Sequence, residues 1–345
     1  MAKRSPKSVV WFLGCGFFIG VHAVVSWLLP NGSFLRLFGN TVQCLFLFVC
    51  YLFTVLNQVR SGKTSRYWTL LSLGFALWLL QQFLWSYYEV IVRVEIPPLF
   101  WGDIILFFHA VPILMAFTIQ PQFGEKRILA RIEIADCLVM LVWWTYLYVV
   151  FVMAWQYFLP DQRNYDFNFN VIYGIANLSV VVAAIISWSR SSGAWRTFYA
   201  HWIGAASLYA IASYVASSAI DQGTYYTGCL YDLPLVAAYA WFAGIGLLGR
   251  ELSLEPLAAP AAKDMLSNWA SRLILATLVG MLFIVVFFSG GSVGIAIHMF
   301  RVNLSIVAAA LVGLIFLLRQ GRLDRVAGMV KSLTRTNTPH PLTDR

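Results

Sequence analysis

Apolar runs of about 20 residues recur along the whole chain, and short polar stretches separate them. A helix of that length can cross a hydrocarbon core about 30 Å thick. We therefore predict about ten membrane spans, at residues 8–29, 36–57, 67–90, 99–119, 132–158, 169–188, 197–219, 228–249, 271–289 and 302–318. The composition agrees, because 60% of the residues are apolar, 11% are charged and the mean hydropathy is +0.73. The predicted fold class is an all-α polytopic membrane protein.

The basic residues predict the orientation of these spans, because Lys and Arg collect in cytoplasmic loops. With the N-terminus inside, 20 of the 24 Lys and Arg residues fall in inner segments, and only Arg36, Arg93, Arg163 and Arg301 fall outside. Both termini are therefore predicted to be cytoplasmic. The net charge of +9 then reflects membrane orientation, so no nucleic-acid partner is predicted.

Two pairs of spans resemble each other weakly. The third and fourth spans, and again the seventh and eighth, combine a helix, an aromatic outer loop and a second helix with an acid in its first turn. We predict two repeated four-helix units, 1–119 and 132–249, in one eight-helix module at 1–249. A cytoplasmic linker at 250–270, a two-helix hairpin at 271–318 and a cytoplasmic amphipathic tail at 319–345 follow.

Ionisable groups in or near a membrane are candidate functional groups. Asp103 and Asp232 lie in the first turns of the fourth and eighth spans, near their outer ends. A carboxylate there also satisfies free backbone N–H groups, so a capping role is the alternative. The candidate ligand pocket at these outer ends consists of Asp103, Asp232, Glu89, Trp85, Tyr88, Trp101 and Tyr231.

A cofactor or a catalytic site would need other residues. His22 and His109 lie inside predicted spans and are the candidate ligands for a haem or pigment. A membrane histidine more often hydrogen-bonds a neighbouring helix, so we predict no cofactor. The five cysteines have no metal-ligand spacing, and hydrolase, metalloprotease and nucleotide motifs are absent. We predict no metal site and no enzyme; an intramembrane enzyme using Asp103, Asp232 and His109 is the alternative.

The last predicted span continues into an amphipathic stretch. Leu323, Val326, Val330 and Leu333 recur at intervals of three and four residues, which is typical of a helix with one apolar face. Such extensions pass a signal from a membrane bundle to a cytoplasmic partner, usually by dimerising. A basic amphipathic tail lying on the inner leaflet is the alternative.

Five short stretches carry a likeness to a known family: "WSYYEV", "PPLFWGDIILFFHAVPIL", "ARIEIADCLVMLVWW", "GTYYTGCLYDLPLVAAYAWFAGIGLL" and the terminal "HPLTDR". Over residues 60–345 the chain resembles the multi-helix membrane input regions of bacterial GGDEF diguanylate cyclases and histidine kinases. The GGDEF loop, its nucleotide site and a kinase core are absent, so no catalytic role carries over.

The resemblance implies a sensory, signal-transducing module in a bacterial inner membrane. It would relay a ligand or the state of the membrane lipid to a cytoplasmic signalling protein, as a homodimer or with a partner in a membrane complex. Two other classes remain open on the sequence alone. One is a structural or accessory subunit of a larger membrane complex, with or without a cofactor. The other is a small-solute transporter, since parallel repeats occur in that class.

Overall fold

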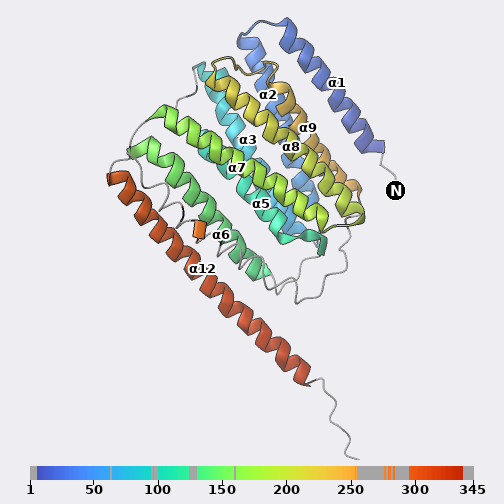
Figure 1. Cartoon of the computed structure of the whole chain (residues 1–345). Coiled ribbons are helices and arrows are strands. Elements are labelled where there is room, and N and C mark those ends of the chain that lie inside the picture. The colour runs from blue at the N-terminus through green and yellow to red at the C-terminus, as the bar shows by residue number, and fades with distance from the viewer. Residues whose placement is uncertain are drawn as a thin grey trace, which may run out of the picture. The chain divides into compact units, whose positions relative to one another are not determined.

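The computed structural model describes residues 6–62, 64–94, 96, 100–123, 130–158, 161–252, 254, 276, 279–280, 283 and 295–336 (Figure 1). All regular structure in this part of the chain is helical, as predicted, and no strand occurs in it. Nine helices in the same residues are long and apolar enough to cross a membrane, which confirms nine of the predicted spans. The tenth, at 271–289, lies outside the described residues except at Ala276, Val279, Gly280 and Phe283.

The described part of the chain forms a series of helices. They are α1 (Pro6–Leu28), α2 (Ser33–Arg60), α3 (Ser65–Ser86), the π-helix η1 (Tyr87–Val92), α4 (Trp101–Phe108), α5 (Ala110–Ile119), the 3-10 turn η2 (Pro121–Phe123), α6 (Ala130–Tyr148), the π-helix η3 (Val149–Phe158), α7 (Gln162–Ser189), α8 (Gly193–Asp221), α9 (Asp232–Glu251) and α12 (Ile295–Thr336).

The span Trp101–Ile119 is broken into two helices, and a proline gives the physical reason. Pro112 has no N–H, so it cannot donate to the carbonyl oxygen four residues earlier, on Phe108. Helix α4 ends at this residue, and His109 separates it from α5. Pro234 is tolerated without a break, because it lies in the first turn of α9, where backbone N–H groups have no partner within the helix.

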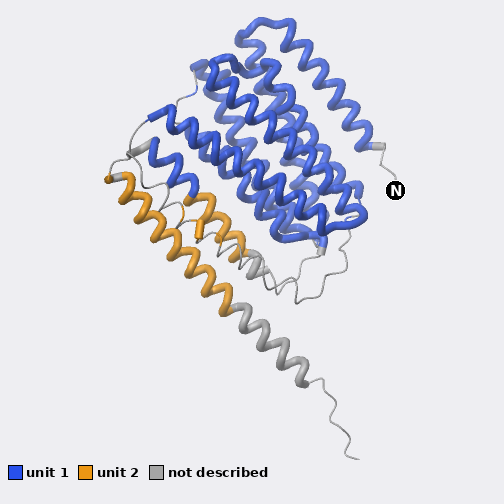
Figure 2. The backbone as a smooth tube through the Cα atoms, viewed as in Figure 1, with its two compact units in different colours: residues 1–124, 147–259 blue, residues 125–146, 260–345 orange. Residues whose placement is uncertain are grey.

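The chain divides into two compact units (Figure 2). Unit 1 comprises residues 1–124 and 147–259, and unit 2 comprises residues 125–146 and 260–345. The boundary between the two units at residues 146 and 147 falls inside α6, whereas the boundaries predicted from the hydrophobic pattern lie between helices. The internal repeat of 1–119 and 132–249 stays a prediction.

Aromatic packing holds the centre of unit 1 together. Within this unit α2 lies against α3 and α9, α8 lies against α7 and α9, and α1 lies against α9. The ring of Trp78 on α3 is 4.5 Å from that of Tyr209 on α8 and 5.1 Å from that of Tyr239 on α9, between centroids. An aromatic pair in such edge-to-face geometry adds about 0.5–1.5 kcal/mol beyond its buried area. The cluster therefore fixes how these helices are rotated against one another.

Two polar contacts join α6 to α12 within unit 2. The Nε of Arg319 donates to Oδ1 of Asp136 at 2.9 Å, and the side chains are only 3% and 13% exposed, respectively. Closer to the other end of α12, the hydroxyl groups of Tyr146 and Ser305 are 2.8 Å apart. These contacts set the register between the two helices.

Asp161 caps the N-terminus of α7. Its Oδ1 accepts a hydrogen bond from the backbone N–H of Asn164 at 3.1 Å, three residues later. We expect Asp161→Ala to lower the free energy of unfolding by about 1 kcal/mol, because one N–H of the first turn loses its acceptor. Asp221→Ala is the matched control: this exposed acid ends α8, where the helix dipole disfavours negative charge. Unfolding by SDS in mixed micelles measures both; equal effects would contradict the capping role.

Candidate functional site

Asp232 is fully buried at the start of α9 and has two donors. The hydroxyl group of Tyr225 donates to Oδ1 at 2.8 Å, and the backbone N–H of Gly228 donates to Oδ2 at 2.7 Å. Both donors lie in the connection between α8 and α9. The carboxylate also lies in the first turn of α9, where the positive end of the helix dipole favours it. Both carboxylate oxygens of Asp232 are thus engaged within the protein.

Two buried groups in this connection, Tyr225 and Cys229, have a raised pKa. Burial, together with the neighbouring Asp232 carboxylate, raises the pKa of Tyr225 well above its usual value. Burial likewise raises the pKa of the Cys229 thiol. The Tyr225 hydroxyl therefore keeps the proton that it donates to Asp232 throughout the physiological pH range.

A second carboxylate, Glu89, lies on η1 and is half-buried. The Nδ2 group of Asn40 on α2 donates to Glu89 Oε2 at 2.8 Å. The Oδ1 atom of the same Asn40 accepts from Gln82 Nε2 at 3.2 Å and from Ser86 Oγ at 2.8 Å, both on α3. One asparagine thus joins α2, α3 and η1, and it orients the Glu89 carboxylate.

The two carboxylates belong to one cluster. The Glu89 charge contributes to raising the pKa of Tyr225, so Glu89 lies within electrostatic range of the residues that hold Asp232. Gln43, one turn after Asn40 on α2, also lies near Asp232. Its side chain is 4% exposed, and its amide interacts with the Asp232 carboxylate. We call Asn40, Gln43, Gln82, Ser86, Glu89, Tyr225 and Asp232 the two-acid cluster.

The backbones of α2 and of the α8–α9 connection are in close contact next to the cluster. Gly228 has φ of 92°, and a Cβ atom there would lie 2.5 Å from the carbonyl oxygen of Leu35. A Cβ atom at Gly39 would lie 2.6 Å from the Gly228 nitrogen. Only glycine fits at both positions. The Ser26 hydroxyl of α1 donates to the Gly228 carbonyl at 2.6 Å, so three segments meet here.

Asp103 lies in a different network. It is half-buried in the first turn of α4, and its Oδ2 accepts from the Tyr165 hydroxyl of α7 at 2.9 Å. The structure therefore brings Asp232 together with Glu89, and it places Asp103 with α7. Whether either aspartate binds a ligand stays a prediction, since the first-turn position also suits a structural acceptor.

The four aromatic residues predicted for the pocket also have different surroundings. The indole N–H of Trp85 donates to Thr227 Oγ1 at 3.3 Å, which links it to the connection that holds Asp232. Tyr88 packs edge-on against Phe100, with ring centroids 5.5 Å apart. Trp101 and Tyr231 are 69% and 39% exposed, so they lie on the surface.

The two candidate haem or pigment ligands have separate surroundings. His109 is 2% exposed and its ring centroid lies 4.3 Å from that of Trp78, inside the aromatic cluster. Its Nδ1 atom is hydrogen-bonded to the Leu106 carbonyl oxygen. His22 on α1 is fully buried, edge-on against Phe38 of α2 at 5.1 Å. No group of three or more metal-binding side chains occurs among the residues that the structure covers.

Comparison of the chain with protein-family models, with curated proteins and with solved structures finds no match. The likeness to bacterial input regions therefore stays a prediction. Four further residues of the cluster were not predicted, although polar side chains within long apolar runs are candidates for such a site: Asn40, Gln43, Gln82 and Ser86. Which of them share a face with Glu89 depends on the rotation of α2 and α3.

Proposed function

We propose that the protein is a membrane sensor, in which unit 1 receives a signal at the two-acid cluster and α12 carries the response to a cytoplasmic partner. The observation that supports this most is the length of α12. Its 42 residues form one helix about 63 Å long at about 1.5 Å per residue. The candidate span within it, Ile297–Gly321, is 25 residues long, so the helix continues beyond the span to Thr336.

The charge distribution supports an orientation with both termini in the cytoplasm, since 20 of 24 Lys and Arg residues fall on that side. The extension of α12 beyond Gly321 then projects into the cytoplasm. Leu323, Val326, Val330 and Leu333 fall on its described helical backbone, and their side chains lie outside the described residues. A stripe at this spacing suits a second copy of the helix or a partner helix.

The proposed mechanism is a population shift. Glu89 is half-buried and belongs to the two-acid cluster, where Asn40 is its hydrogen-bond donor. A cationic or polar ligand that binds there favours one packing of unit 1. The change reaches unit 2 along the backbone, because η3 continues directly into α6 and α6 carries Asp136. Asp136 forms an ion pair with Arg319 of α12, and Arg319 lies next to the proposed cytoplasmic extension.

A photocrosslinking amino acid placed along the extension tests the output half of this proposal. We expect crosslinks in native membranes at positions 323, 326, 330 and 333 to exceed those at positions 324, 325 and 328, on the other side of the helix, several-fold. The crosslinked product identifies the partner by mass spectrometry: a second copy or a cytoplasmic signalling protein supports the proposal. Equal crosslinking on all faces would overturn it, and crosslinks only to other membrane subunits would favour an accessory role.

The substitution Glu89→Gln tests the input half. It removes the charge and keeps an oxygen that can accept from Asn40 Nδ2. We expect the crosslinking yield along the extension to change at least several-fold, while the protein keeps its expression level and its helix content. Asp221→Asn is the matched control, because it removes an exposed carboxylate from the end of α8. The same yield in Glu89→Gln and in the unsubstituted protein would contradict a signalling role for the cluster.

A further inference from the structure

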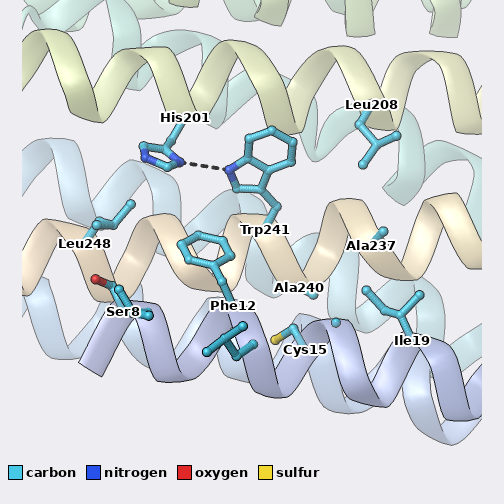
Figure 3. A pocket seen from close by; sticks show the side chains of 13 residues that line it. Ser8, Phe12, Cys15, Ile19, His201, Leu208, Ala237, Ala240, Trp241 and Leu248 are labelled. Atoms are coloured by element: carbon cyan, nitrogen blue, oxygen red, sulfur yellow. Dashed lines mark hydrogen bonds between the residues drawn. The ribbon is translucent and has the colours of Figure 1, made fainter. Parts of the chain in front are cut away.

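A groove follows α1 where this helix faces α8 and α9 in unit 1 (Figure 3). It encloses a cavity of about 490 Å³, within the range of about 300–1,000 Å³ that is typical of ligand sites. Its walls are apolar for most of its length, with Phe12 and Ile19 on α1, Leu208 on α8 and Ala237 on α9. All three helices are candidate membrane spans, so the groove lies at membrane depth.

A second cavity of about 390 Å³ continues the groove toward the start of α8. His201 and Trp241 line both cavities, and the indole N–H of Trp241 donates to Nδ1 of His201 at 3.1 Å. This second cavity brings in Arg196, whose guanidinium carbon lies 4.4 Å from the centroid of the Trp188 ring. Arg196 is exposed, and no carboxylate of the described residues pairs with it.

The dimensions of the groove fit one lipid chain. It extends from Ser8 to Ile19 along α1 and from Leu248 to Ala237 along α9, which is about 16 Å at about 1.5 Å per residue. This is about half of a hydrocarbon core about 30 Å thick, the depth of one leaflet.

We propose that the groove binds an anionic phospholipid, with one acyl chain between α1 and α9 and the phosphate beside Arg196. A guanidinium favours a phosphate, and Trp188 and Trp241 are residues that typically lie at headgroup level. Arg196 lies at the same end of the groove as the N-terminal turn of α1, which contains Lys7 and Ser8. The bound lipid therefore belongs to the leaflet on that side. This site is separate from the two-acid cluster and does not depend on the proposed sensory function.

The test uses the full-length protein in nanodiscs of phosphatidylcholine that contain a phosphatidylglycerol with a photoactivatable group in one acyl chain. We expect the label on α1, α8 and α9, and a several-fold loss of label in Arg196→Gln. Arg190→Gln, which removes an exposed cation six residues earlier that does not line the groove, should label like the unsubstituted protein. A photoactivatable phosphatidylcholine that labels the groove equally well would overturn the choice of an anionic lipid.

Variants that fill the groove provide a second test in the same labelling experiment. Gly16 lines it, and a Cβ atom there would meet nothing within 4 Å, so Gly16→Leu fills the space without a clash. Gly14→Leu is the matched control, because Gly14 has equally open surroundings and does not line the cavity. We expect labelling to fall several-fold in Gly16→Leu alone. Unchanged labelling would overturn the proposal, and competition by inorganic phosphate would indicate a free anion instead of a lipid. If Gly16→Leu does not fold, the labelling of Arg196→Gln and of Ala237→Phe, which also fills the groove, decides whether the lipid binds there.

Discussion

Replacing Arg319 by Met should lower the free energy of unfolding by about 3–5 kcal/mol. The Asp136 carboxylate that the guanidinium holds at 2.9 Å is only 13% exposed, so the variant leaves a nearly buried charge without its partner. Breaking a buried ion pair on one side typically has an effect of this size. SDS-induced unfolding in mixed micelles, followed by circular dichroism, measures it. Arg190→Met, which removes an exposed arginine, should change the unfolding free energy by no more than about 0.5 kcal/mol.

The double variant Asp136→Leu with Arg319→Met separates the ion pair from simple packing. Replacing both partners removes the unpaired charge, and apolar substitutes of similar volume are often neutral or stabilising. We therefore expect the double variant to be more stable than either single variant, with a coupling free energy of at least about 1.5 kcal/mol. If the effects of the two single substitutions on the unfolding free energy simply add, the Arg319–Asp136 contact makes no specific contribution to the packing of α6 against α12.

Asp232→Ala should destabilise the protein by about 3–5 kcal/mol. It removes the acceptor of two hydrogen bonds, from the Tyr225 hydroxyl and from the Gly228 N–H, and each bond to a charged group contributes about 1.5–3 kcal/mol. Both donors then remain in a site where Asp232 itself is 0% exposed. The unfolding free energy in mixed micelles is again the measurement.

Asp103→Ala is the matched comparison for Asp232→Ala. It removes the same side chain from the same first-turn position, but Asp103 is half-buried and accepts one hydrogen bond among the described residues, from the Tyr165 hydroxyl. We expect about half the effect of Asp232→Ala. Such a result would identify Asp232 as mainly a structural acceptor and leave Glu89 as the carboxylate that receives the signal. A stable Asp232→Ala variant would contradict this division and return Asp232 to the list of candidate ligand-binding groups.

Local pattern was enough to predict the class of fold. Membrane spans are visible in sequence because each backbone polar group in a bilayer must be paired within its own helix, so only apolar length matters. Nine predicted spans are helices in the described part of the chain, and Asp103 and Asp232 both lie in the first turn of a helix, as expected. The orientation, the repeat and the function stay predictions, because each depends on more than local hydropathy.

The grouping of side chains was decided only by the tertiary structure. An apolar residue is equally acceptable against lipid and against another helix, so hydropathy does not define how a span is rotated. Rotation places Asn40 between Glu89 and Gln82, and it places Asp103 beside Tyr165, away from the two-acid cluster. The lipid groove likewise joins three segments, 8–19, 201–208 and 237–248, that are far apart in the chain. The sequence determined which segments enter the membrane, and helix packing determined which polar groups meet there.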